Sequence, residues 1–271
     1  MQVLARIILE GSSVKLEVAT LEAICRSTGC TPASAVVADL DSEDPPVALD
    51  PYRPFYPASM IKVPLAAAVL ALDHDLEGRH PIAAANMTAN DAESPLEPGY
   101  QASLRELLER AVARSDNVAT NVLFDLAGRE RATAIARDRL GLRETAFHRK
   151  LSGSDPLIDD PGWDGAHRNA HPAGDAARLF AAIARDAVPH AALLRELLAA
   201  QYWNDKLSAG LREGDRFAHK TGDTSEVTHD GGILTTATGG RYAVVVYLER
   251  PSTPENNARF GPLMRALRAY L

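Results

Sequence analysis

The chain has 271 residues, of which 46% are hydrophobic, and a formal net charge of −7. This is enough to bury a sizeable core in one large domain, and the absence of any lysine and arginine cluster argues against nucleic acid as a partner. Five charged residues interrupt the first 24 positions, so neither a signal-peptide core nor a membrane span is predicted. We expect a monomer that is cytoplasmic by default, or periplasmic or secreted if a leader was removed.

In chain order, the first predicted elements are a helix and a hairpin. The helix is 21–27, and the turn 41–46 joins the strands 35–40 and 47–49. From Ser59 to about Gln201 the hydrophobic pattern is mainly helical. Its five clearest helical segments are 104–114, 116–126, 130–140, 174–184 and 191–200.

Strand patterns return beyond Lys206, and the chain closes with an amphipathic helix. The strands are 217–220, 231–236 and 241–248, and the helix is 260–271. Strands at both ends predict an α/β (α+β) fold in which helices flank one antiparallel sheet made from N- and C-terminal segments. Within a single domain, 1–271, we expect a sheet lobe (1–58 plus 202–271), an inserted all-helical lobe (59–201) and a cleft between them.

The segment Ser59-Met60-Ile61-Lys62 places a hydroxyl three residues before an amine. Ser59 begins a long apolar run, so it would stand at the start of a buried helix with Lys62 on the same face. Helix N-terminal amides favour developing negative charge, and an apolar surround favours a neutral amine that accepts the hydroxyl proton. Taken alone, the motif is more simply explained as an N-cap serine and a lysine that reaches solvent. A similar pattern at 12–15 shows how easily it arises.

Two further motifs follow, Ser115-Asp116-Asn117 and Lys220-Thr221-Gly222. Alone, Ser115 is explained as a helix cap and Lys220 as a charged strand end before a glycine turn. Together the three motifs lie at a helix start, a loop of the helical lobe and a sheet strand, at separations of 56 and 105 residues. Only five lysines occur in the chain, and two of them fall inside these motifs. The ordered set predicts a serine acyl-transfer site walled by three elements.

On these motifs the chain resembles the class A beta-lactamases and, more broadly, the serine beta-lactamase and penicillin-binding protein superfamily. The resemblance extends over most of the chain and includes 56–62, 115–121, 141–145 and 219–222. It implies an acyl-enzyme on Ser59, with Lys62 as proton acceptor. It further implies catalytic roles for Ser115, which would relay a proton, and for Lys220, which would hold the substrate carboxylate. The backbone amides of Ser59 and Asp223 would form the oxyanion hole. Substrate contacts would come from Asn117, Thr221, Gly222 and Asp223.

The first departure from that family lies after Arg149, where the glutamate that activates the deacylating water is replaced by Leu151. A leucine cannot take a proton, so the usual base for product release is missing. The aspartates of the following loop are substitutes to consider, although loop aspartates are more often solvated turn formers; they are Asp155, Asp159 and Asp160. Asn121, which in the family helps to orient the glutamate, would be left without its partner.

The second departure follows the third motif, where Asp223 occupies a position that the family commonly fills with serine or alanine, and Glu226 lies close behind. A carboxylate there would disfavour an anionic substrate, although its backbone amide could still serve the oxyanion hole. His229-Asp230 could rebalance this charge. The more favoured interpretation of His229 is an ordinary loop histidine before the strand.

No metal and no organic cofactor are expected. Cys25 and Cys30 are too few for a disulfide framework or a zinc site, and we interpret them as structural thiols. His167 and His171, near Asp164, imitate a metal site, but neighbouring glycine and proline predict a loop.

The leading hypothesis is a serine hydrolase that opens beta-lactam amides. An esterase or D-alanyl peptidase with the same motifs is the alternative within the enzymes. The second hypothesis belongs to another class of protein: a penicillin-binding sensor or trap that is acylated once and cannot release the acyl group, because Leu151 replaces the base. A scaffold that retains the fold without acylation is the third hypothesis.

Overall fold

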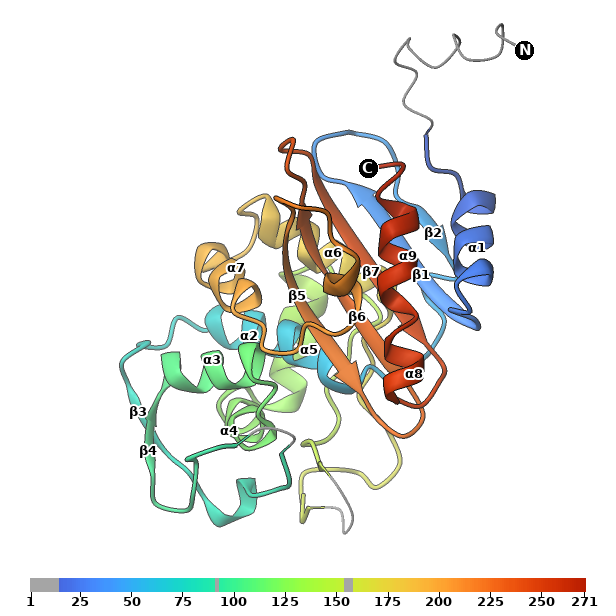
Figure 1. The fold of residues 1–271 in the computed structure, drawn as a ribbon. Coiled ribbons are helices and arrows are strands. Elements are labelled where there is room, and N and C mark those ends of the chain that lie inside the picture. Colours follow the sequence, from blue (N-terminus) through green and yellow to red (C-terminus); the bar gives the residue numbers. More distant parts are fainter. Residues whose placement is uncertain (1–14, 91–92, 154–157) are drawn as a thin grey trace, which may run out of the picture.

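The structure is a computed structural model that describes residues 15–90, 93–153 and 158–271. Its centre is a five-stranded antiparallel sheet in the order β2-β1-β7-β6-β5, made from both ends of the chain (Figure 1). The strands are β1 (Ala33–Asp39), β2 (Val47–Leu49), β5 (Arg216–Asp223), β6 (Thr228–Thr235) and β7 (Arg241–Leu248). The predicted mixed fold with an antiparallel sheet is confirmed.

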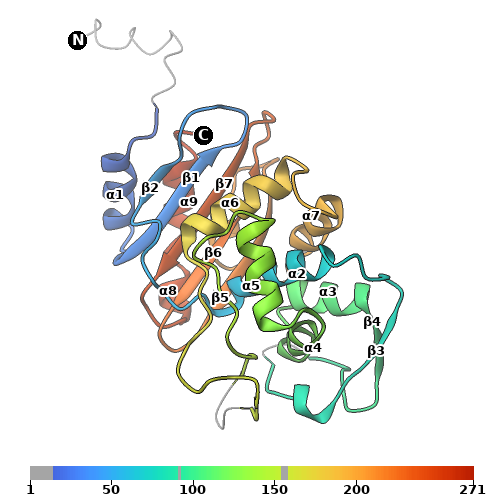
Figure 2. The ribbon, with the colours of Figure 1, turned by 180° about the vertical axis from the view of Figure 1, so that it is seen from behind.

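The two faces of the sheet are covered by different helices, because side chains of its central strands alternate between two hydrophobic clusters. Val244 and Val246 of β7 pack with α1 (Val18–Ser27) and α9 (Phe260–Leu267). Val245 and Tyr247 belong to the cluster on the other face. There α6 (Ala173–Ala184) crosses the sheet, as the view from behind shows (Figure 2).

The second cluster continues into the helical part, whose centre is α2 (Lys62–Leu70). All nine residues of α2 are buried, which agrees with its almost uninterrupted apolar sequence. The helices packed around it or beyond it are α3 (Leu104–Ala113), α4 (Asn117–Ala127), α5 (Arg129–Asp138) and α7 (Ala191–Ala199). The division of the chain into two lobes stays a prediction.

Several short elements have no signal in the sequence pattern. Strands β3 (Arg79–Pro81) and β4 (Gln101–Ser103) form a separate two-stranded ribbon. The others are the single-turn helices η1 (Ala58–Ile61), η2 (Ala84–Asn86) and η3 (Leu207–Gly210), and α8 (Pro254–Asn257). Three or four residues are too few to show a hydrophobic period. Strand β5 extends beyond the predicted 217–220 and carries the whole third motif.

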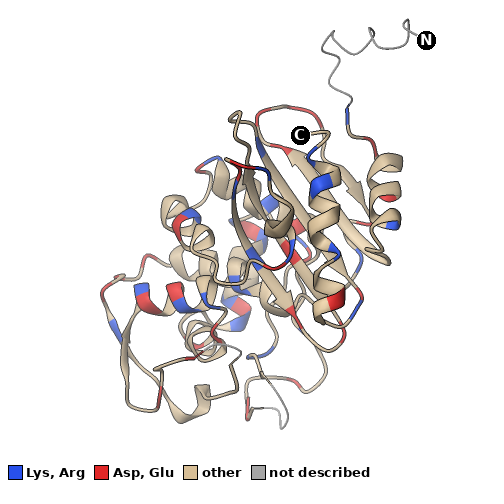
Figure 3. Ribbon diagram, viewed as in Figure 1, with Lys and Arg blue, Asp and Glu red and all other residues tan. Residues whose placement is uncertain are grey.

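Basic and acidic residues are interspersed along the ribbon and form no basic face in the view of Figure 3. Among the described residues, no helix is both long and apolar enough to cross a membrane.

Candidate active site

Ser59 lies in the single turn η1, which runs directly into α2. Ala58 before it has a positive φ of 48°, a left-handed conformation that costs a non-glycine residue about 1–3 kcal/mol. Strand β5 packs closely against this turn: a Cβ atom added to Gly222 would lie 3.0 Å from the carbonyl oxygen of Pro57. The glycine of the third motif therefore allows the sheet to approach the half-buried Ser59.

Lys62 is fully buried, one helical turn beyond Ser59. Its Nζ donates hydrogen bonds to the backbone carbonyl of Ser115 and to Asn117 Oδ1 at 2.8 Å, and it lies 3.2 Å from the Ser115 hydroxyl. These contacts exclude the interpretation of a lysine that reaches solvent. They join the first motif directly to the second.

Ser115 does not cap the following helix. Asp116 is the N-cap of α4, and its carboxylate accepts from the backbone amide of Ala119 at 3.0 Å. Ser115 has a positive φ of 63°, and its hydroxyl also accepts from Lys220 Nζ at 3.0 Å. One hydroxyl oxygen is therefore within hydrogen-bonding distance of the amines of the first and third motifs.

Lys220 and Thr221 are buried on β5. Besides the Ser115 hydroxyl, Lys220 Nζ contacts the carbonyl oxygen of Thr221 at 2.9 Å. Asn117 is 8% exposed, and its side-chain amide donates to the carbonyl oxygen of Ala89 at 3.0 Å. The structure thus brings the polar groups of all three motifs together.

The motifs open into a cleft of about 780 Å³. Five of the predicted site residues line it: Ser59, Ser115, Asn117, Thr221 and Asp223. The amines of Lys62 and Lys220 lie behind this wall, through their bonds to Ser115. Sequence reasoning missed several other lining residues, which lie in irregular segments or in the four-residue helix α8: Trp203, Asp205, Ser252 and Asn257.

Leu151 also lines the cleft, and it is 5% exposed. Its backbone forms a two-bond clamp with Asn121: its amide donates to Asn121 Oδ1 at 2.8 Å, and its carbonyl accepts from Asn121 Nδ2 at 3.0 Å. Asn121 has no carboxylate to orient at position 151, and its amide binds the backbone of Leu151 instead.

The proposed substitutes for the missing base differ in their surroundings. Asp160 is paired with Arg129 and accepts from the backbone amide of Lys150 at 2.8 Å. Asp159 is exposed, and neither it nor Asp160 lines the cleft. Asp155 lies outside the described residues.

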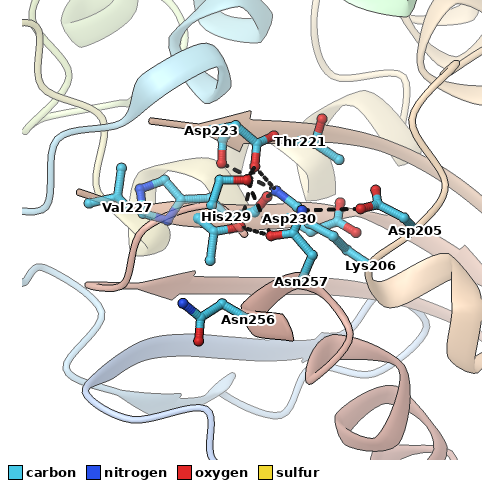
Figure 4. Close-up of polar contacts among 12 residues, drawn as sticks. Asp205, Lys206, Thr221, Asp223, Val227, His229, Asp230, Asn256 and Asn257 are labelled. Atoms are coloured by element: carbon cyan, nitrogen blue, oxygen red, sulfur yellow. Dashed lines mark hydrogen bonds and ion pairs between the residues drawn. The ribbon is translucent and has the colours of Figure 1, made fainter. Parts of the chain in front are cut away.

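At the far end of β5, Asp223 forms an ion pair with Lys206 (Figure 4), a residue that the sequence did not single out. Burial would raise the pKa of the Asp223 carboxyl, but the Lys206 ammonium and hydrogen bonds from Lys206 and Ser252 outweigh it, so the pKa lies below its ordinary value.

His229 does not rebalance the charge of Asp223. It lies within β6 rather than in a loop, and burial lowers its pKa to about 4. Its Nε2 is 2.8 Å from the carbonyl oxygen of Tyr56, and its Nδ1 accepts from the backbone amide of Leu248 at 3.2 Å. Both contacts suit the neutral ring. Asp230 is paired with His219 at 2.7 Å.

The described residues contain no group of three or more histidines, cysteines or acidic residues that could hold a metal ion. His167 pairs with Asp164 at the surface, while His171 is buried beside Thr145. Cys25 and Cys30 are free, buried thiols, and burial raises the pKa of Cys25 to about 12.

A family model described as the beta-lactamase enzyme family matches residues 17–271. No curated protein matches the chain. Among solved structures, PBP-A is 25% identical with a TM-score of 0.77, over 92% of this chain and 94% of that one. A leucine-to-glutamate variant of PBP-A, in an acyl-enzyme complex with penicillin G, is 24% identical with a TM-score of 0.79, over 95% and 97% of the two chains.

A beta-lactamase from Sphaerobacter thermophilus has the same fold, with 23% identity and a TM-score of 0.78, over 93% of this chain and 97% of that one. The fold is therefore shared by beta-lactamases and by PBP-A. Since the family model spans nearly the whole chain, the resemblance noted in the sequence is confirmed: the chain belongs to the beta-lactamase enzyme family.

Proposed function

We propose that the protein is a serine hydrolase of the beta-lactamase and penicillin-binding type, in which Ser59 attacks a beta-lactam amide and retains the acyl group. The observation that supports this most directly is the Ser115 hydroxyl, which lies 3.2 Å from Lys62 Nζ and 3.0 Å from Lys220 Nζ. It forms a short path for a proton from the nucleophile to the leaving nitrogen.

In the proposed reaction, a neutral Lys62 takes the proton of the Ser59 hydroxyl as its oxygen bonds to the carbonyl carbon. The backbone amides of Ser59 and Asp223 would stabilise the oxyanion, and each such donor is worth about 2.7–4 kcal/mol of barrier. Ser115 passes a proton to the leaving nitrogen as the amide bond breaks, and Asn117 holds the acyl side chain. The product of this step is an ester on Ser59.

We further propose that this ester is released slowly. Leu151 supplies no base at the wall of the cleft, and its clamp with Asn121 occupies the amide that would otherwise bind a water or a carboxylate. A leucine-to-glutamate variant of PBP-A is described as an acyl-enzyme with penicillin G, which supports acylation by a beta-lactam on this fold. A sensor or trap, or a peptidase or esterase that turns over other substrates, is then favoured over a fast beta-lactamase.

The test is a time course with nitrocefin and benzylpenicillin at stoichiometric and substoichiometric protein, followed by intact mass. We expect one acyl adduct per chain that persists, and none with Ser59→Ala. Sustained turnover lost in Ser59→Ala would reject slow release and establish a beta-lactamase with another base. The absence of any adduct would reject acylation by beta-lactams, and the substrate would then be sought among esters and peptides.

A further inference from the structure

The carboxylate of Asp223 lies at the mouth of the site, next to the nucleophile turn. Gly222, which precedes it, packs against Pro57 and Ala58, and Asp223 lines the same cleft as Ser59. Figure 4 shows Asp223, Lys206 and Asn257 converging at this end of β5. Any group attached to the substrate on this side meets these side chains.

The ammonium group of Lys206, beneath Asp223, already has an acceptor for each of its N–H donors. Lys206 is 1% exposed, and an ammonium has three N–H donors. Its Nζ contacts Asp223 Oδ1 at 2.5 Å, the carbonyl oxygen of His229 at 3.0 Å and that of Gly222 at 3.4 Å. Three acceptors match the three donors, so Lys206 has none left for a substrate carboxylate.

Asp223, in contrast, has acceptor capacity to spare. Oδ1 receives Lys206, the hydroxyl of Ser252 at 2.5 Å and the hydroxyl of Thr228 at 3.3 Å. The described residues provide no hydrogen bond to Oδ2, and the side chain is 36% exposed. This oxygen is available to a donor from the substrate.

The other charged side chain in the described lining of the cleft is also acidic, and the amines of Lys62 and Lys220 lie behind Ser115. Asp205 is the second carboxylate in its lining, and it accepts from Asn257 Nδ2 at 3.1 Å. The described residues that line the cleft include no lysine or arginine. A carboxylate bound beside Asp223 would therefore face like charge in a partly desolvated place, whereas an N–H or ammonium group would find an acceptor.

We propose that Asp223 selects acyl donors whose leaving-group side is neutral or cationic, such as an ester or a carboxamide, over those that carry a free carboxylate there. The inference rests on the proposed acylation of Ser59. Its distinctive element is that an internal carboxylate already neutralises Lys206 and presents its second oxygen to the substrate.

The test compares benzylpenicillin with its methyl ester, which differ only at this group. Second-order rate constants for the Ser59 adduct are measured by intact mass, and each is divided by the alkaline hydrolysis rate of the same compound to remove intrinsic reactivity. We expect the ester to acylate the protein faster, on the order of tenfold. Asp223→Asn should remove or reverse this ratio. Glu226→Gln, which makes the same charge change at an exposed residue paired with Arg168, should preserve it.

A carboxylate preference in the unaltered protein, or the same ratio in Asp223→Asn, would overturn the inference while leaving Ser59 acylation intact. Because Asp223→Asn leaves Lys206 buried without its ion-pair partner, the double variant Asp223→Asn with Lys206→Met removes both charges and should also lose the ratio. An absence of adduct with either compound would instead reject the proposed function, and with it this inference.

Discussion

Two hydrogen bonds to Asn121 hold Leu151 in the wall of the cleft. The two hydrogen bonds between them use only backbone atoms of Leu151, so the position of this wall does not depend on the side chain that it carries. The leucine side chain is 5% exposed, and in the proposed reaction it offers no base to the Ser59 ester.

Leu151→Glu is accordingly expected to keep the clamp and to supply a carboxylate at the cleft. General-base catalysis typically contributes about 10²–10⁴-fold, so deacylation of the penicilloyl adduct should accelerate by at least about 10²-fold. Decay of the adduct mass after removal of free penicillin measures it. Leu151→Gln, of the same size but without a titratable group, is the control. Equal decay in both variants would argue against the missing base as the cause of slow release.

At the level of elements, two helices begin with a side-chain cap, and only one of these caps lies beside the site. Asp116 caps α4, the helix that begins at Asn117 and directly follows Ser115. Ser103 caps α3 in the same manner, through a bond from the backbone amide of Glu106 at 3.1 Å, but it carries no site residue. A comparison of variants at these two caps therefore separates the effect of a cap on stability from its effect on the site.

Asp116→Ala and Ser103→Ala should each lower the free energy of unfolding, by about 0.5–2 kcal/mol. Only Asp116→Ala should also slow acylation of Ser59, because it loosens the turn that places the Ser115 hydroxyl between two amines. Urea denaturation and the adduct time course provide the two readouts. Equal acylation rates in the two variants would show that α4 does not position Ser115 through this cap.

The long helices and strands were predictable because each repeats its hydrophobic period several times, and the three motifs were predictable because their order is specific. The pair formed by Lys206 and Asp223 was not. Lys206 lies in an irregular segment without a period, and its acceptors come from β5 and β6. The clamp of Asn121 was missed for a related reason: its partner is a backbone, which leaves no trace in residue identity.

Across the whole molecule, two buried neutral histidines link stability to pH. Burial lowers the pKa of His171 to about 3 and that of His229 to about 4 from an ordinary value of 6.5. Below pH 6.5 the unfolded chain binds protons that the folded chain does not, so stability is lost as the pH falls from about 6.5 toward 4.

His229→Gln should therefore flatten the pH dependence. Its amide can replace both hydrogen bonds of the neutral ring, and the slope of the unfolding free energy between pH 6 and 4.5 should fall by up to about 1.4 kcal/mol per pH unit. Urea unfolding across this range measures it. An unchanged slope would mean that His229 is protonated as readily in the folded as in the unfolded protein.

The pairing of β1 with β7, from Ala33 opposite Leu248 to Asp39 opposite Tyr242, has a consequence for biosynthesis. A ribosome synthesises β5 and its Lys220 about 160 residues after the Ser59 turn, and the sheet that supports them closes only when β7 emerges. Contacts so distant in sequence form slowly. We therefore expect Ser59, the proposed nucleophile, to stay unreactive on the nascent chain until β7 has emerged.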